Sequence, residues 1–173
     1  KIIIFNAPTG FGKSTTLPYC LLQHYQIKVY VVVPKVILAI KISSYLGSGN
    51  NDFHGMTMGT NLGYNTGEAK NLPCMSSSII YITQRIAEYT IINEHEPCFV
   101  LIDEFHDFSN VQTCSLLEKV PFLRSHQKCI LTSATPPTEF IANYYDIVPK
   151  DCVITAKITD NIAPPKAAAI KPI

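Results

Sequence analysis

The sequence Ala7-Pro8-Thr9-Gly10-Phe11-Gly12-Lys13-Ser14-Thr15 follows the apolar stretch Ile2–Phe5 and opens a stretch of helical periodicity, Lys13–His24. A buried strand, a glycine-containing turn and a helix in this order form the context that a phosphate-binding loop requires. The same three parts are the first unit of an α/β domain. We therefore predict that all nine residues of this segment bind nucleotide, and that the strand before them lies inside a sheet.

Four residues of this segment have the chemistry that a phosphate site needs. Gly10 and Gly12 let the backbone turn its N–H groups toward an anion, and the start of the helix adds the positive end of its dipole. Lys13 can reach the β- and γ-phosphates, and the Ser14 hydroxyl can bind Mg²⁺. The strict form of the motif has glycine at the position of Ala7, but only the last two glycines must approach the phosphate closely. The alternative is a serine that caps a helix after a glycine turn.

Strand and helix patterns alternate along the rest of the chain. The apolar stretches that predict strands are Ile2–Phe5, Lys28–Val33, Ile79–Ile82, Phe99–Ile102, Cys129–Thr132 and Val153–Lys157. The stretches that predict helices are Lys13–His24, Val36–Tyr45, Gln84–Ile92, Val111–Leu117 and Thr138–Tyr145. This alternation is typical of a parallel sheet, because parallel neighbours need crossover connections. We predict an α/β fold in three layers, with a mostly parallel sheet and helices on both faces.

Two segments depart from the alternation. Gly47–Ser78 is rich in Gly, Asn, Ser and Thr, so we expect loops there with one short strand near Met56–Thr60. The last residues contain three prolines and an alanine triplet, which indicates a linker. We therefore expect a domain over residues 1–158 and a linker over residues 159–173.

The sequence Val100-Leu-Ile-Asp-Glu-Phe-His106 places two carboxylates directly after a buried strand. Charges so close to a core are costly unless they serve a metal or a partner. Asp103 can hold Mg²⁺, directly or through water. Glu104 can bind the same Mg²⁺ and polarise an attacking water. The alternative is an ordinary acidic loop after a strand.

A third polar sequence, Ser133-Ala134-Thr135, also follows an apolar strand. Its hydroxyls can connect a nucleotide site to another part of the molecule, although a plain polar turn is the simpler interpretation. The carboxyl ends of parallel strands meet at one edge of the sheet, where ligands bind. We therefore expect Lys13, Asp103 and Ser133 to converge there.

These three sequences, in this order and spacing, resemble the first RecA-like domain of superfamily 2 helicases of the DExH group. The resemblance covers about residues 1–150 and implies a RecA-like P-loop NTPase domain that binds ATP or another NTP with Mg²⁺. Within the group, Ala7–Thr15 and Ser133-Ala-Thr-Pro-Pro137 are similar to helicases in polyproteins of positive-strand RNA viruses. These include flavivirus, pestivirus and potyvirus relatives, and a hypovirus-like virus fits as well. Phe105 departs from the common versions of the Asp-Glu-x-His box.

The resemblance also implies contacts with single-stranded nucleic acid, with RNA favoured by the viral similarity. Pro34 and Lys35 resemble the motif that contacts the sugar-phosphate backbone, and Gly63 resembles part of a glycine–tyrosine loop. Thr83 lies in Ile82–Ile86, which resembles a further backbone-contacting motif. Lys35 is alternatively a solvated lysine, and Thr83 is alternatively a helix N-cap.

The same resemblance implies that His106 and the sequence Ser133-Ala134-Thr135 couple the state of the bound nucleotide to movement of the nucleic-acid strand. The arginine-rich element that completes such a site comes from a second RecA-like domain, so residues 1–173 should hydrolyse NTP very slowly when isolated. The whole protein is expected to unwind RNA. Two alternatives are a translocating P-loop ATPase that separates no strands, and a decayed scaffold that binds RNA or protein.

Composition limits the other possibilities. The 173 residues carry 14 basic and 13 acidic side chains, so nucleic acid must bind through a local patch rather than a polybasic arm. No apolar stretch is long enough for a membrane span. The six cysteines have no metal-knuckle spacing and are expected to be buried, reduced thiols, which indicates a reducing compartment, the cytoplasm.

Overall fold

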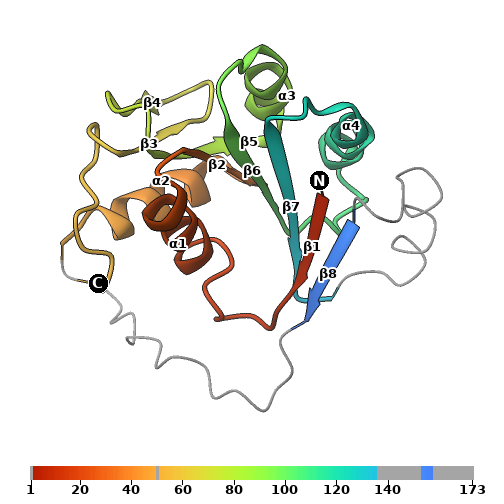
Figure 1. Ribbon diagram of the computed structural model, residues 1–173, viewed down its shortest axis with the longest axis horizontal. Helices are drawn as coiled ribbons and strands as arrows, with labels where there is room; N and C mark the ends of the chain where they lie inside the picture. Colours follow the sequence, from red (N-terminus) through yellow and green to blue (C-terminus); the bar gives the residue numbers. More distant parts are fainter. Residues whose placement is uncertain (1, 50, 136–152, 158–173) are drawn as a thin grey trace.

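The computed structural model describes residues 2–49, 51–135 and 153–157, and its centre is a twisted, mostly parallel sheet (Figure 1). Within the described residues the strand order is β4-β3-β5-β2-β6-β7-β1-β8, and every neighbouring pair is parallel except β3 with β4. The strands are β1 (Ile2–Asn6), β2 (Lys28–Val33), β3 (Leu62–Asn65), β4 (Lys70–Asn71), β5 (Ile79–Thr83), β6 (Cys98–Asp103), β7 (Gln127–Ser133) and β8 (Val153–Lys157). The helices are α1 (Thr16–Tyr25), α2 (Val36–Leu46), α3 (Gln84–Asn93), α4 (Val111–Lys119) and the short 3₁₀ helix η1 (Val120–Phe122).

Alternating side chains on the central strands produce the three layers. On β2, Val31 and its alternate neighbours pack in one hydrophobic cluster with residues of α1 and α2, such as Ala39. Val32 and Tyr30 point to the other face and pack in a second cluster with residues of α3 and α4, such as Leu116. Figure 1 shows these two helix pairs on opposite sides of the sheet. Each fully buried aliphatic side chain contributes about 1.5–3 kcal/mol, so the sheet is held from both faces and the predicted α/β fold is confirmed.

All six predicted strands are present, and four of them extend one or two residues further. The predicted helix over Lys13–His24 begins later, at Thr16, because residues 13–15 form a turn in which the Gly12 carbonyl accepts from the amides of Thr15 and Leu17. The predicted helix over residues 138–145 and the predicted linker over residues 159–173 lie outside the described residues.

The segment between α2 and β5 differs from the prediction. The strand expected near Met56–Thr60 is wrong: only an isolated bridge joins Met58 and Leu62, because Gly55 and Gly59 have left-handed φ angles of 80° and 79° that interrupt extended backbone. The predicted glycine–tyrosine loop is instead part of β3. Gly63 packs under the next chain segment, where an added Cβ would lie 2.3 Å from the Asn71 carbonyl oxygen.

The five described cysteines differ in burial: two are buried, two are exposed and Cys114 is half-buried, while Cys152 lies outside the described residues. Cys98 and Cys129 are buried between the sheet and the layer of α3 and α4, as predicted, and burial raises the pKa of Cys98 to about 12 and that of Cys129 further. Cys20 and Cys74 are exposed, so the expectation of burial is wrong for them. In the part of the chain that the structure describes, no helix is long and apolar enough to cross a bilayer.

Candidate functional site

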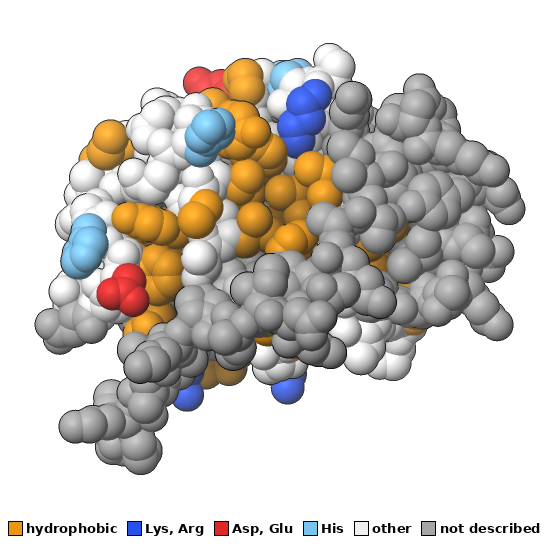
Figure 2. Space-filling view, turned by 60° about the horizontal axis from the view of Figure 1, so that its bottom comes forward, with side chains coloured by type: hydrophobic (Ala, Val, Ile, Leu, Met, Phe, Trp, Pro, Cys, Tyr) orange, Lys and Arg blue, Asp and Glu red, His pale blue; other side chains and the backbone are white. Residues whose placement is uncertain are grey.

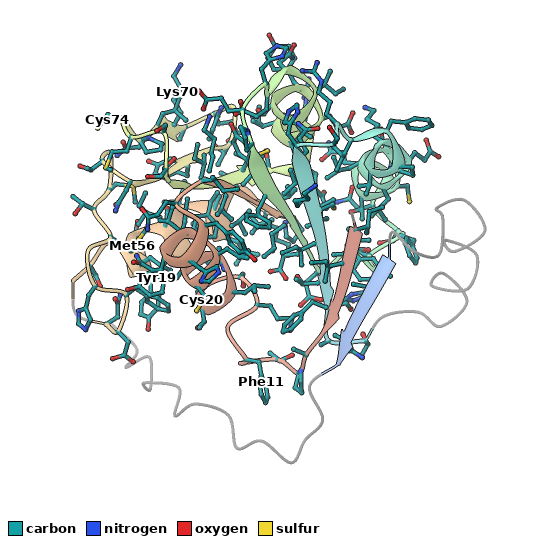
Figure 3. All side chains as sticks on the ribbon, in the orientation of Figure 1. Phe11, Tyr19, Cys20, Met56, Lys70 and Cys74 are labelled. Atoms are coloured by element: carbon teal, nitrogen blue, oxygen red, sulfur yellow. The ribbon has the colours of Figure 1, made fainter. Side chains whose placement is uncertain are left out.

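The predicted phosphate loop runs from the end of β1 to the start of α1. Gly10 and Gly12 have φ angles of 88° and 73°, in the left-handed region that favours glycine. A Cβ on Gly12 would also lie 2.3 Å from the Thr16 hydroxyl oxygen, so the loop has no room for a side chain there. Figure 3 shows Phe11 pointing away from the sheet, so its ring stays out of the concave side of the loop.

Lys13 spans the inside of this loop. Its Nζ donates to the carbonyl oxygens of Ala7 and Pro8 at 3.0 and 3.2 Å, and the residue is only 6% exposed. The two hydrogen bonds hold the ammonium group within the curve of the backbone. A positive charge fixed in that position suits the β- and γ-phosphates of a bound nucleotide.

Strand register brings the other two predicted sequences to the same edge. Asp103 ends β6 opposite Thr132 of β7, and Ser133 lies opposite Asn6, the last residue of β1. The Thr132 hydroxyl donates to Asp103 Oδ1 at 2.8 Å, which orients a carboxylate that is 8% exposed. The Ala7 amide then donates to the Ser133 carbonyl at 3.2 Å, so the phosphate loop is joined directly to the end of β7.

The turn after Asp103 has unusual backbone geometry. Glu104 has a φ of 51°, an uncommon left-handed conformation for a residue with a side chain, which costs on the order of 1–3 kcal/mol. Phe105 holds the turn in place because its ring is completely buried and its amide donates to the Thr132 carbonyl at 3.3 Å. The Glu104 side chain is 38% exposed and lies beside His106.

His106 connects this turn to the end of β7. Its Nδ1 lies 3.2 Å from Glu104 Oε2 and 2.8 Å from Ser133 Oγ, and the tautomer decides which groups donate. Ser133 Oγ also accepts from the Thr135 amide at 3.0 Å. The structure therefore brings three predicted site residues together around His106 Nδ1: Glu104 and His106 from the turn after β6, and Ser133 from the end of β7.

Tyr81 is a member of the site that the sequence did not predict. Its side chain is fully buried on β5, and its hydroxyl donates to the Ser14 carbonyl at 2.6 Å. Burial raises the pKa of Tyr81 well above its usual value, and the nearby Asp103 carboxylate raises it further. Tyr81 therefore lies between the phosphate loop and Asp103. A tyrosine in the otherwise apolar stretch Ile79–Ile82 was the available signal, because a buried phenol needs a hydrogen-bond partner.

The oxygen donors at this edge fit a magnesium–nucleotide pair. The candidate ligands are the Ser14 hydroxyl and the Asp103 carboxylate, with Glu104 beside them, and Mg²⁺ prefers such oxygen ligands. Among the described residues, no group of three His, Cys, Asp or Glu side chains could hold a metal by itself. Magnesium in nucleotide sites usually takes only one or two protein ligands and completes its shell with phosphates and water, so this donor set matches that use.

The residues predicted to contact nucleic acid occupy a neighbouring part of the same edge, with one exception. Lys35 and Thr83 follow or end the paired strands β2 and β5, where Val33 lies opposite Thr83. They precede α2 and α3 at the N-cap positions, and neither side chain makes a capping hydrogen bond. Pro34 lies beside them. Gly63 is buried in β3 instead, and close packing accounts for it.

A family model described as DEAD/DEAH box helicase matches residues 1–143. The chain belongs to this family. Its described fold is the nucleotide-binding motor domain of a DExH helicase. A crystal structure of the Escherichia coli DEAH/RHA helicase HrpB superposes with a TM-score of 0.66 at 26% identity, over 89% of this chain and 20% of that one.

Named relatives of this DExH domain are much longer proteins. It is 27% identical over 158 residues to the human ATP-dependent RNA helicase TDRD9, which covers 85% of this chain and 11% of the relative. It is 29% identical over 141 residues to the Escherichia coli ATP-dependent RNA helicase HrpB, which covers 77% of this chain and 17% of the relative. Superfamily 2 membership is therefore shown, whereas these cellular relatives give no support to the viral resemblance.

Proposed function

We propose that the protein containing this domain hydrolyses a nucleoside triphosphate with Mg²⁺ and uses the cycle to move along and unwind RNA. The observation that carries the proposal is the junction of three motifs at one sheet edge. The Ala7 amide joins the phosphate loop to Ser133, and His106 joins Ser133 to Glu104. The names of the relatives, ATP-dependent RNA helicases, support the choice of substrate.

The geometry suggests a role for each side chain in this cycle. Lys13 binds the β- and γ-phosphates from inside its loop. Ser14 and Asp103 would hold Mg²⁺, which would neutralise phosphate charge. Glu104 orients a water that attacks the γ-phosphorus, and the bond to the β–γ bridging oxygen breaks as the diphosphate leaves. When hydrolysis changes the position of Glu104, His106 and Ser133 transmit that change to β7.

We further propose that residues 1–158 form this domain and that residues 159–173 lead to a second RecA-like domain. The relatives are about six to nine times longer than the matched segment, which leaves room for such a domain. An arginine supplied by a partner domain is worth about 10³–10⁵ in rate in related phosphoryl transfers. Residues 1–173 alone should therefore hydrolyse ATP very slowly compared with the full-length protein.

The decisive experiment measures ATP hydrolysis by the full-length protein, with and without single-stranded RNA, and strand separation of an RNA duplex. Glu104→Gln should retain nucleotide binding and lose about 10²–10⁴-fold in turnover, because the general base is gone. Lys13→Ala should lose nucleotide binding itself. Normal turnover by Glu104→Gln would remove Glu104 from its assigned role.

The same assays separate the two alternatives. RNA-stimulated hydrolysis without strand separation would favour a translocating ATPase, and no hydrolysis at all would favour a decayed scaffold. Replacing RNA by DNA of the same sequence tests the preference for RNA over DNA.

Figure 2, which views the edge at the bottom of Figure 1, shows few charged side chains among the coloured residues of this face. The coloured part of this face therefore carries no broad basic patch.

We also propose a viral polyprotein as the source and a reducing compartment, the host cytoplasm, as the location. The source proposal depends only on the similarity of Ala7–Thr15 and Ser133-Ala-Thr-Pro-Pro137 to viral helicases. A polymerase or protease in the same reading frame would support it, and a cellular gene would contradict it. The free thiols of Cys20 and Cys74 support the reducing compartment, and thiol labelling of the protein in cells tests it.

A further inference from the structure

We propose that Gln84 is a positioning residue that holds the turn Asp103–His106 against α3. Gln84 would thereby link binding of the nucleic-acid strand to the nucleotide site. Buried Gln84 and Thr113 and half-buried Asn110 form a cluster, which we call the Gln84 clasp. This inference deepens the proposed function and depends on it. Gln84 directly follows Thr83 in the stretch that resembles a backbone-contacting motif, whereas Asn110 and Thr113 belong to none of the motifs named above.

Both ends of the Gln84 amide are bonded. Its Nε2 donates to the Thr113 hydroxyl at 2.6 Å, and its Oε1 accepts from Asn110 Nδ2 at 3.0 Å. The residue is 2% exposed and Thr113 is completely buried. A buried amide bonded at both ends fixes the relative position of the two chain segments, because an unpaired buried polar group is costly.

Asn110 connects the clasp to the catalytic turn. Its side-chain oxygen accepts from the Gln112 backbone amide at 2.9 Å and so caps α4. Its backbone amide donates to the Asp107 carbonyl at 3.3 Å. The Asp107 amide in turn donates to the Glu104 carbonyl at 3.2 Å. Two successive backbone hydrogen bonds therefore connect Glu104 with the residue that Gln84 holds.

The other end of the clasp lies beside Thr83, the residue proposed to contact nucleic acid. Gln84 is the first residue of α3 and directly follows Thr83, the residue at the carboxyl end of β5. A nucleic-acid phosphate bound at the start of α3 would therefore act on the element to which Gln84 belongs. Glu104 keeps its left-handed backbone only while the turn is held at both ends, by Phe105 at one and the clasp at the other.

A purely structural role is the competing explanation, because α3 and α4 also pack together through apolar residues such as Ile91 and Leu116. The two explanations differ in what they predict for coupling. By linkage, a strand that tightens nucleotide binding must itself bind more tightly when nucleotide is present. A clasp that only stabilises the fold changes melting temperature and leaves this coupling unchanged.

The test uses full-length protein, a non-hydrolysable ATP analogue and a short oligouridylate. The measured quantity is the nucleotide Kd without oligouridylate divided by the Kd with it, together with RNA stimulation of kcat. Thr113→Val keeps the shape of the side chain but removes the hydroxyl that Gln84 uses, and Thr113→Ser is its matched control. Asn110→Asp keeps the oxygen that caps α4 but removes the amide that donates to Gln84.

Both Thr113→Val and Asn110→Asp should reduce the coupling ratio by about 2- to 30-fold, the range expected for residues that link two sites. Thr113→Ser should retain it, and nucleotide Kd without RNA should stay at the wild-type value in all three. The double variant Gln84→Met/Thr113→Val should lose no more than Gln84→Met alone, because removal of the Gln84 amide already breaks its hydrogen bond to Thr113.

Wild-type coupling in folded Thr113→Val and Asn110→Asp would overturn the inference. An equal loss in Thr113→Ser and Thr113→Val would overturn it as well. If Thr113→Val does not fold, as judged by melting temperature, Asn110→Asp decides. Absence of any coupling in the wild-type protein would instead show that the proposed function has failed.

Discussion

At the scale of single residues, the site depends on groups that hold other groups. Thr132 orients the Asp103 carboxylate, and Phe105 secures the turn that carries Glu104. Tyr81 does the same for the phosphate loop, through its hydrogen bond to the Ser14 carbonyl. Because burial raises the pKa of Tyr81 above its usual value, the phenol is protonated and donates a hydrogen bond at neutral pH.

Tyr81→Phe should weaken binding of the magnesium–nucleotide pair by about 2- to 10-fold, since one hydrogen bond contributes about 0.5–1.5 kcal/mol. The loss should be smaller in the presence of a chelator, because the Ser14 hydroxyl is the proposed metal ligand. Titration of a fluorescent nucleotide with and without Mg²⁺ measures both values. Tyr30→Phe is the matched control, since Tyr30 donates to Glu94 and takes no part in the site. Wild-type affinity in Tyr81→Phe would contradict this role.

At the scale of elements, β3 and the segment that follows it show how one residue decides a local structure. Gly63 lies so close to the chain above it that a Cβ would contact the Asn71 carbonyl oxygen and, at 2.7 Å, Pro73 Cδ. The short β4 can therefore pair with β3 and close this edge of the sheet. A glycine that resembles a functional loop residue is explained here by packing.

Gly63→Ala should lower the free energy of unfolding by about 1–3 kcal/mol, as expected when a methyl group is forced into a packed site. Backbone atoms provide the closest contact, so the site cannot relax by rotating a side chain. Gly47→Ala is the control, because its φ is −83° and its nearest new contact is the flexible end of Leu62 at 3.3 Å. Urea unfolding followed by circular dichroism measures both variants. Equal stability of the two would show that β3 and β4 can separate without cost.

At the scale of the whole molecule, the strands and the shared edge could be predicted because buried parallel strands are apolar on both faces and end at polar motifs. The convergence of Lys13, Asp103 and Ser133 follows from that rule alone. The Gln84 clasp and the bond from Tyr81 to Ser14 could not be predicted, because they join segments whose separation in sequence carries no pattern. Gly63 was misinterpreted because sequence does not show which backbone lies above a glycine.

The pH dependence of the free energy of unfolding should show the contribution of the ion pair between Lys28 and Glu94, which lies at the opposite end of the sheet from the site. Burial alone would raise the pKa of Glu94, but hydrogen bonds from Lys28 at 2.8 Å and Tyr30 at 2.6 Å, at the start of β2, outweigh it and lower the pKa to about 2. In the unfolded chain the ordinary value is 4.5. Because the folded pKa is the lower one, this carboxylate stabilises the fold above pH 4.5, and the contribution is lost as the pH falls toward 2.

Urea unfolding of residues 1–173 over that pH range should therefore show a steeper loss of stability for the wild-type chain than for Glu94→Gln, which has no carboxylate to protonate. Glu96→Gln is the control: Glu96 is 63% exposed and lies 3.5 Å from the same Lys28 ammonium, a distance and exposure at which an ion pair contributes little. Its pH profile should follow the wild type. Parallel profiles for wild type and Glu94→Gln would mean that the carboxylate titrates alike in the folded and unfolded chain, and that the contact between β2 and the segment after α3 holds without its charge.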